Sequence, residues 1–231
     1  MSHRAVHRPV SFFASTCLLI VAMENTSRPL IRVVDDEASL RRALVFLLES
    51  AGWEVATYAS AADFLTTWTE PAVPGCLILD IRMPLMSGLE LQRILNDRNI
   101  HLPIIFLTGH ADVSIAVQAM KLGACEFIEK PFKDQVLLDA IGQAVRHDLV
   151  RHEEYASWRA LHERLEKLSP RETEVARLVA EGLPNKSIGQ QLNISERTVQ
   201  VHRLHLMEKL SIHSAAELAQ MMLRAGHKDA S

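Results

Sequence analysis

Short apolar runs alternate with amphipathic segments along the first part of the chain. Each run is rich in Val, Ile and Leu and ends at polar or turn residues, a pattern typical of strands buried on both faces of a parallel sheet. The segments between the runs carry apolar residues at helical spacing, and Gly52 and Gly123 follow two of them, as at helix ends. The pattern predicts strands at 30–34, 54–58, 76–80, 104–107 and 126–129, and helices at 39–50, 61–68, 89–96, 114–121 and 134–149.

This alternation predicts an α/β fold with a five-stranded, doubly wound parallel sheet of the flavodoxin-like type. In such a sheet the carboxyl ends of the strands share one edge, where ligands bind. Polar residues stand at four of the expected strand ends, namely Asp35 and Asp36, Asp80, Thr108, and Lys130. We therefore expect three carboxylates, a hydroxyl and an ammonium group to converge at that edge.

The chemistry of this group of residues points to phosphoryl transfer. Three neighbouring carboxylates repel one another unless a divalent cation neutralises them, and hard oxygen ligands suit Mg²⁺. A carboxylate beside magnesium, with a lysine and a hydroxyl ready for phosphoryl oxygens, is equipped to accept a phosphoryl group. Taken singly, each residue has an ordinary explanation, because Asp and Thr cap helices and turns, Lys is often solvated, and strand aromatics are usually core. Only the joint interpretation accounts for four strand ends at once.

The last third of the chain is helical in pattern. Residues 146–163 are charged, and we interpret them as a linker that extends the preceding helix. Next, Ser169 and Glu172 form a capping box with Pro170 at the first helical position. Helices are expected from there to about residue 181 and at 186–192, 195–210 and 214–222, which makes a small all-α, four-helix domain. Its second and third helices, joined by a tight turn, predict a helix-turn-helix.

The third helix of this domain has an outer face suited to DNA. Gln can read adenine and Val or Leu can meet a thymine methyl group in the major groove, whereas Lys and Arg suit phosphates. The alternative is a solvated face on a helical interaction domain. The residues expected on the base-facing side are Gln200, Val201, Leu204 and His205, and those expected to contact phosphates are Lys186, Arg197, Arg203 and Lys209.

Charge and cysteine content agree with this organisation. The formal net charge of −3 combines an acidic segment, residues 29–145 with 9 basic and 15 acidic residues, and a mildly basic one, residues 164–231 with 10 and 8. The three cysteines form no CxxC pair and their odd number argues against a disulfide framework. Cys76 and Cys125 fall in expected buried strands, so a reducing cytoplasm is the simplest context.

Residues 1–28 precede the first expected strand. Basic residues there stand before an apolar run, which superficially resembles a signal peptide but is short for a membrane span. Because Met23 offers a second start, we interpret the segment as a disordered or mis-annotated leader rather than a signal, and expect no membrane association. The expected domains are then residues 29–145 and 164–229, joined by the linker 146–163.

The first domain resembles the receiver domain of two-component response regulators. The matching segments are Val33-Val34-Asp35-Asp36-Glu37, Leu79-Asp80-Ile81-Arg82-Met83-Pro84 with Gly88, Phe106-Leu107-Thr108-Gly109, and Phe127-Ile128-Glu129-Lys130-Pro131-Phe132. The resemblance implies that Asp80 is the phosphoacceptor and that Asp36 and Asp80 bind Mg²⁺ directly. It also implies that Asp35 holds the ion partly through water and that the backbone carbonyl of Arg82 completes the protein ligands.

The same resemblance implies a switch. A sensor histidine kinase would phosphorylate Asp80, and Thr108 and Lys130 would contact the phosphoryl group. Phe127 would be the switch aromatic, rotating inward into the space that Thr108 vacates. Receivers would then pair as a homodimer along the face of the 114–121 helix and the last strand. On that helix, Val117 is a candidate interface residue or a core residue.

The last domain resembles the LuxR-type DNA-binding domain. The matching segments are Leu168-Ser169-Pro170-Arg171-Glu172, Gly182-Leu183-Pro184-Asn185-Lys186-Ser187-Ile188, and Ile194-Ser195-Glu196-Arg197-Thr198-Val199-Gln200-Val201-His202-Arg203. One departure is Gly189, where alanine is usual. Together the two domains are most similar to the FixJ branch of response regulators, which implies double-stranded promoter DNA and RNA polymerase as partners.

Two other functions are compatible with parts of this sequence. Aspartyl-phosphate hydrolases also use an acidic magnesium pocket, but they usually carry a second acid two residues after the nucleophile, where this chain has Arg82. A regulator that binds DNA without phosphorylation would not need an intact acidic pocket. We therefore expect a transcriptional regulator and not an enzyme.

Overall fold

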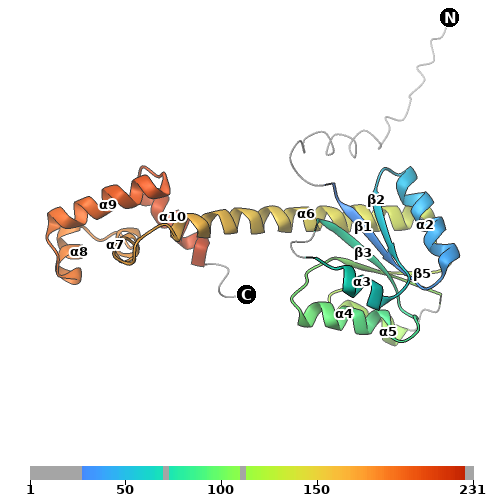
Figure 1. The fold of residues 1–231 in the computed structure, drawn as a ribbon. Helices are drawn as coiled ribbons and strands as arrows, with labels where there is room; N and C mark the ends of the chain where they lie inside the picture. The colour runs from blue at the N-terminus through green and yellow to red at the C-terminus, as the bar shows by residue number, and fades with distance from the viewer. Residues whose placement is uncertain (1–27, 70–72, 110–112, 227–231) are drawn as a thin grey trace, which may run out of the picture. The chain divides into compact units, whose positions relative to one another are not determined.

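The computed structural model describes residues 28–69, 73–109 and 113–226. Of the expected leader, residues 1–28, only Arg28 lies within these ranges. The chain divides into two compact units, Met1–Leu149 and Val150–Ser231, and each is described by itself (Figure 1). No helix within the described ranges is long and apolar enough to cross a membrane.

A single parallel sheet forms the centre of the first unit. Its strands are β1 (Leu30–Val34), β2 (Glu54–Tyr58), β3 (Gly75–Asp80), β4 (Ile104–Thr108) and β5 (Glu126–Glu129). They lie in the order β2-β1-β3-β4-β5, and every neighbouring pair is parallel. The central strands β3 and β4 are buried along their whole length, because helices cover both faces of the sheet.

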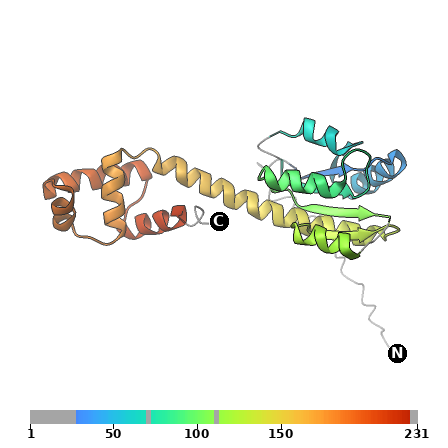
Figure 2. The ribbon, with the colours of Figure 1, turned by 90° about the horizontal axis from the view of Figure 1, so that it is seen from below.

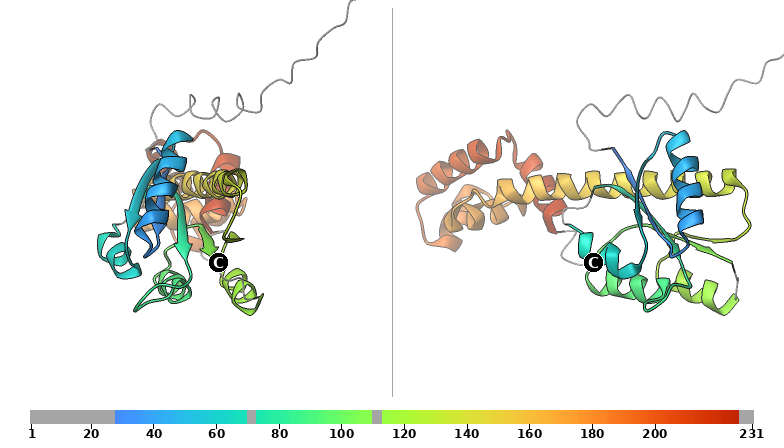
Figure 3. Two further views of the ribbon diagram at one scale, coloured as in Figure 1. Left: turned by 90° about the vertical axis from the view of Figure 1, so that its right-hand side faces the viewer. Right: turned by 45° about the vertical axis from the view of Figure 1, so that its right-hand side comes forward.

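Five helices follow the strands in alternation. They are α2 (Ala38–Ser50), α3 (Ala61–Thr67), α4 (Gly88–Asp97), α5 (Val113–Lys121) and α6 (Asp134–Leu165). The helices α3, α4 and α5 share one core cluster with one face of the sheet, whereas α2 and the first half of α6 share the other (Figure 3). This arrangement confirms the expected doubly wound fold.

The helix α6 runs beyond the helix expected at 134–149. It continues without a break to Leu165 and so includes the whole of the linker expected at 146–163, which the sequence analysis interprets as an extension of this helix. Near the end of the first unit, Asp148 is completely buried and accepts a hydrogen bond of 2.8 Å from the Gly75 amide at the start of β3. This contact holds α6 against the edge of the sheet opposite the strand ends considered above.

The second unit contains four further helices. These are α7 (Pro170–Ala180), α8 (Asn185–Leu192), α9 (Glu196–Leu210) and α10 (Ala215–Gly226), shown in Figure 2. The expected capping box is present, since the Ser169 hydroxyl accepts from the Glu172 amide and the Glu172 carboxylate accepts from the Ser169 amide. Asn193 ends α8 in the left-handed conformation, with φ 54°. The helices α8 and α9, joined by this turn, form the predicted helix-turn-helix.

Gly189 allows the two helices of this motif to approach closely. A Cβ atom at this position would lie 2.8 Å from the Ile194 carbonyl oxygen, closer than real Cβ contacts. The Ile194 amide also donates a 2.9 Å hydrogen bond to the Gly189 carbonyl. The departure to glycine therefore fits this turn, although glycine costs about 1 kcal/mol of helix propensity.

The exposure of two side chains bears on the sequence predictions. Cys125 is exposed and stands immediately before β5 instead of within a buried strand, whereas Cys76 is buried as predicted. Cys125 lies outside the strand because β5 starts only at Glu126, as expected, after the left-handed turn at Gly123 with φ 90°. Val117 on α5 is 46 % exposed, so it is not core in this unit.

Candidate functional site

Three of the expected strand ends meet in one ionic cluster. Asp35 follows β1, Asp80 ends β3 and Lys130 follows β5. The Lys130 ammonium nitrogen lies 2.9 Å from Oδ2 of Asp35 and 2.9 Å from Oδ1 of Asp80. The carboxylates are almost fully buried, with side chains 4 % and 10 % exposed, and the lysine side chain is 21 % exposed. Residues up to 95 positions apart in sequence thus form one buried site.

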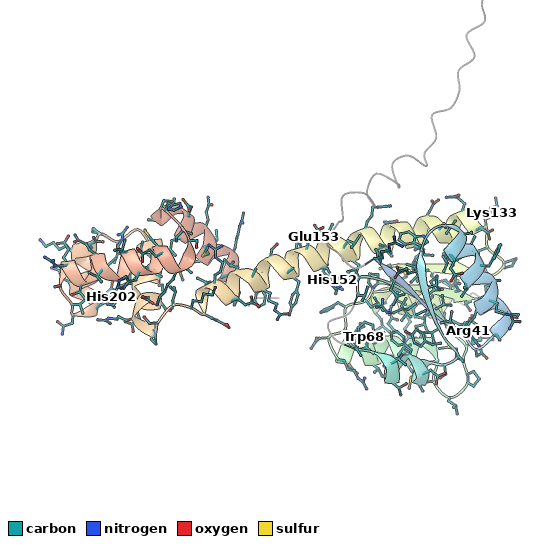
Figure 4. All side chains as sticks on the ribbon, turned by 45° about the horizontal axis from the view of Figure 1, so that its top comes forward. Arg41, Trp68, Lys133, His152, Glu153 and His202 are labelled. Atoms are coloured by element: carbon teal, nitrogen blue, oxygen red, sulfur yellow. The ribbon has the colours of Figure 1, made fainter. Side chains whose placement is uncertain are left out.

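Backbone groups fix the orientation of both carboxylates. The Glu37 amide donates to Oδ1 of Asp35 at 2.8 Å, and the Arg82 amide donates to Oδ2 of Asp80 at 2.7 Å. Arg41, labelled on α2 in Figure 4, donates from its guanidinium group to the Asp35 carbonyl oxygen at 2.6 Å. Each carboxylate therefore has one oxygen held by the main chain and the other by Lys130.

Burial and charge act in opposite directions on the ionisable groups. Burial raises the pKa of Asp80, and the hydrogen bond and charge of Lys130 only partly offset this effect. For Lys130, burial alone would lower the pKa, but the two carboxylates outweigh it, so that its pKa is raised. The site thus contains a lysine that stays protonated beside an aspartate that is protonated more easily than usual.

Thr108 and Phe127 stand beside this cluster. Thr108 ends β4 and is 1 % exposed, and its carbonyl oxygen accepts from the Lys130 amide at 2.7 Å. Phe127 on β5 is half-buried and lies in register with Phe106 of β4, with ring centroids 6.5 Å apart. Thr108 therefore ends the strand beside β3, whereas Phe127 lies one strand further out, on the strand that leads to Lys130.

Gly88 brings the start of α4 close to the strand that ends at Asp80. Its amide donates to the Ile81 carbonyl oxygen at 3.0 Å. A Cβ atom at position 88 would lie 2.3 Å from the Asp80 carbonyl oxygen and 3.0 Å from the ring of Phe106. This close approach of two backbones requires glycine.

Not all of the expected metal ligands are brought together. Asp36 is exposed, unlike Asp35, and within the described part of the chain no three acidic, histidine or cysteine side chains are grouped closely enough to hold a metal ion. Lys130 instead joins two carboxylates. The available donors are hard carboxylate oxygens on neighbouring strand ends, and this donor set fits Mg²⁺.

The expected DNA-contacting residues lie on α8 and α9. On α9, Gln200, Val201, Leu204 and His205 are exposed, Leu204 at 58 %. Val199, Leu206 and Leu210 of the same helix are buried in the core of the unit. The outer face thus carries the residues that the sequence assigns to it, and two of them are aliphatic, which is unusual for a solvated surface.

The expected phosphate-contacting residues differ in their surroundings. Lys186 and Arg197 are exposed. Arg203 donates to Oδ1 of Asn185 at 2.8 Å, and Lys209 lies 2.6 Å from Oε2 of Glu172. Partners separated by 18 and 37 positions in sequence leave no local signal, so the sequence did not reveal these two internal contacts.

Each of the two units matches a known protein family. A model of the response regulator receiver domain matches residues 31–142, and a model of the bacterial regulatory proteins of the luxR family matches residues 166–222. The chain is 44 % identical to nodulation protein W of Bradyrhizobium diazoefficiens over 86 % of this chain and 87 % of that protein. It is 44 % identical to the transcriptional regulatory protein FixJ of Rhizobium meliloti, over 85 % and 96 % of the two chains.

A solved structure is also similar over most of the chain. The response regulator StyR matches with a TM-score of 0.80 and 42 % identity, covering 86 % of this chain and all of that one.

Proposed function

Because the chain belongs to the two-component response regulators that join a receiver domain to a LuxR-type DNA-binding domain, we propose that Asp80 is its phosphoacceptor. Members of this family are DNA-binding transcriptional regulators and not enzymes, and the receiver domain implies a sensor kinase as partner. The observation that carries the proposal is the position of Lys130, 2.9 Å from both Asp35 and Asp80. If the aspartates only capped helices or turns and Lys130 were only a solvated lysine, these three side chains would not need to be in contact.

The proposed reaction transfers a phosphoryl group from a histidine of the kinase to Asp80. A carboxylate oxygen of Asp80 forms a bond to phosphorus, the bond between phosphorus and the histidine nitrogen breaks, and that nitrogen keeps the electron pair. The Arg82 amide orients the carboxylate through its 2.7 Å hydrogen bond. Lys130 remains charged beside the new phosphoryl oxygens, because its pKa is raised.

We propose Mg²⁺ as the cofactor of this step. The residues that would hold it are Asp35, Asp36 and Asp80, with the backbone carbonyl of Arg82. When bound, the ion would neutralise charge on the phosphoryl oxygens. Asp36 follows Asp35 in the chain and is exposed, and Lys130 bonds the carboxylates of Asp35 and Asp80.

Phosphorylation is proposed to act through Thr108 and Phe127. Thr108 would bond the new phosphoryl oxygen, and Phe127 would move further into the core. Two observations support this switch. Phe127 is only half-buried although it packs beside the fully buried Phe106, and the carbonyl of Thr108 already bonds the Lys130 amide. The exposed side of α5, with Val117, would then pair with a second receiver.

The DNA-binding unit is proposed to act as a dimer on promoter DNA. Gln200, Val201, Leu204 and His205 would face the bases, and Lys186, Arg197 and Arg203 would contact phosphates. Lys209 would contact a phosphate only if its ion pair with Glu172 breaks. We place the receiver at residues 29–145, the linker at 146–163 and the DNA-binding domain at 164–229, and expect the protein to work in the cytoplasm with RNA polymerase.

The proposal is tested by labelling the full chain with acetyl phosphate and Mg²⁺ and measuring the added phosphoryl mass. Asp80→Asn should abolish labelling, because an amide does not attack phosphorus. Asp97→Asn, which changes an exposed carboxylate of α4, should be labelled like the unchanged protein. Labelling that persists in Asp80→Asn would move the phosphoacceptor to another residue.

A further inference from the structure

The second half of α6 carries a row of aromatic side chains. Tyr155 and Trp158 stack with ring centroids 6.0 Å apart, and Trp158 packs on His162 at 3.9 Å. Tyr155 is 54 % exposed, and the other two residues are half-buried. We call Tyr155, Trp158 and His162 the aromatic stripe. A row of aromatic side chains, one exposed and two partly exposed, on an otherwise charged helix is typical of a surface that meets a partner.

The aromatic stripe has the spacing of a coiled coil. Its members are three and four residues apart, so they occupy successive a, d and a positions of a heptad repeat. The same register places Asp148 at the preceding a position and Leu165 at the next d position. Asp148 is buried against the Gly75 amide, and Leu165 packs on the core of the DNA-binding unit. The stripe therefore occupies the stretch of α6 between these two anchored positions.

The charged residues beside the aromatic stripe can pair with the same residues of a second copy of the chain. In this register Glu154 is at a g position and Arg159 at the following e position, and both are exposed. In a parallel pair of helices the g residue faces the next e residue of the other helix, so each Glu154 would meet Arg159 of the second copy. An antiparallel pair would instead bring like charges together. The charges therefore favour a second copy of this helix in parallel orientation.

We propose that the aromatic stripe pairs in parallel and in register with the stripe of a second copy of this chain. This inference rests on the proposed phosphorylation-dependent dimer, because the stripe spans less than two heptads and is too short to associate alone. Two paired receivers would hold the helices at a high effective concentration. The paired stripes would then orient both DNA-binding domains about one two-fold axis.

One intrahelical contact competes with the proposed charge pairs. The Arg159 guanidinium lies 3.1 Å from the Glu163 carboxylate of the same helix, and both side chains are at least 60 % exposed. Exposed ion pairs of this kind contribute little to stability. Arg159 can therefore leave Glu163 for a partner across the dimer at a small cost in free energy. Glu163→Gln removes this competition and is therefore the background for the tests.

The first test measures dimer dissociation of the phosphorylated full chain by analytical ultracentrifugation. Glu154→Arg should weaken the dimer roughly three- to tenfold, because two symmetric pairs become repulsive. Adding Arg159→Glu should restore the affinity. The matched control is Glu153→Arg, one residue away at the f position and labelled in Figure 4, which makes the same charge change and should leave the dimer unaffected. Equal effects of Glu153→Arg and Glu154→Arg would overturn the pairing, and so would failure of the charge exchange to restore it.

The second test uses disulfide cross-linking between copies. In a Cys17→Ser, Cys125→Ser background, with the buried Cys76 retained, Arg151→Cys at a d position should cross-link only after phosphorylation. Val150→Cys, at an exposed c position, should not. A phosphorylated chain that sediments as a dimer without cross-linking at 151 would overturn the pairing and leave the proposed dimer intact. A phosphorylated chain that stays monomeric would overturn both. If Tyr155→Ala lowers the melting temperature of the unphosphorylated monomer and leaves dimer affinity unchanged, the stripe packs within its own chain and the pairing is wrong.

Discussion

Lys209 Nζ lies 2.6 Å from Oε2 of Glu172, and this ion pair joins the last turns of α9 to the first turn of α7. The same carboxylate oxygen accepts a hydrogen bond of 2.8 Å from the Ser169 amide. The Lys209 hydrogen bond, followed by the capping bond, lowers the pKa of Glu172 from 4.5 to about 2. One carboxylate therefore caps α7 and holds α9 against it.

Glu172→Gln should destabilise the full chain by about 1–2 kcal/mol at neutral pH, because it removes a charged hydrogen bond and weakens a cap. The pKa of Glu172 is lower in the folded than in the unfolded state, so its contribution is complete above about pH 4.5 and is lost as the pH falls towards 2. The difference in free energy of unfolding between the two proteins should shrink over that interval. Urea unfolding followed by circular dichroism at several pH values measures it.

Glu174→Gln is the matched control. Glu174 lies two positions further along α7 and forms an exposed pair with Arg171 at 2.6 Å. Its replacement should change the free energy of unfolding by less than about 1 kcal/mol. If both glutamates behave alike, the pair with Lys209 does not stabilise the unit.

The sequence predicted the strand ends of the receiver well because one rule governs them. Parallel strands bring their carboxyl ends to one edge, so Asp35, Asp80 and Lys130 had to meet once the apolar runs were read as strands. The rule does not say which of two adjacent acids turns inward. Asp35 is buried and Asp36 exposed, and only the path of the chain into α2 decides this.

The pattern of hydrophobic and polar residues does not predict contacts between helices that are distant in the sequence. The pair of Lys209 with Glu172 depends on how α9 crosses α7, and hydrophobic spacing does not fix that crossing. The length of α6 has a different cause. The sequence between 150 and 165 is charged and lacks glycine and proline, so no residue in it stops the helix. Interpreting this stretch as a linker does not predict the residue at which the helix ends.

Lys130→Ala should still allow some labelling of Asp80 but uncouple it from dimerisation, since the ammonium group reads the phosphoryl oxygens. Loss of the ammonium also removes the interactions that lower the pKa of Asp80, so this pKa should rise further. A protonated carboxyl is not a nucleophile, and the labelling rate should therefore begin to fall at a higher pH than in the unchanged protein. Rates of labelling by acetyl phosphate across pH, with sedimentation of the product, measure both effects.

Lys133→Ala provides the control, because Lys133 is an exposed lysine nearby in sequence (Figure 4). It should leave the pH profile and the dimer unchanged. Normal phosphorylation-dependent dimerisation of Lys130→Ala would remove Lys130 from the switch.

Gly88→Ala should lower the free energy of unfolding by about 1–3 kcal/mol, because its Cβ would overlap the Asp80 carbonyl oxygen at 2.3 Å. Backbone must move to relieve the overlap, so labelling of Asp80 should slow as well. Gly142→Ala in α6 is the contrast, since its Cβ would meet only the flexible end of Arg146 at 3.3 Å and gains helix propensity. Equal stability of the two variants would show that α4 can shift without cost.

The last prediction separates base reading from phosphate contact in the DNA-binding domain. Gln200→Ala should relax preference at one base position in each half-site, at a cost of about 1–3 kcal/mol on the best site and little on random DNA. Lys186→Ala should weaken binding to all duplexes alike and lower the salt slope by about one, because a phosphate contact releases counterions without reading sequence. Lys209→Ala should instead lower the free energy of unfolding and leave the salt slope nearly unchanged, because the Lys209 ammonium is bound to Glu172. Binding to specific and random duplexes at several salt concentrations distinguishes the three variants. If Gln200→Ala and Lys186→Ala both reduce affinity uniformly and the preferred sequence stays the same, α9 does not lie in the major groove with its exposed face towards the bases.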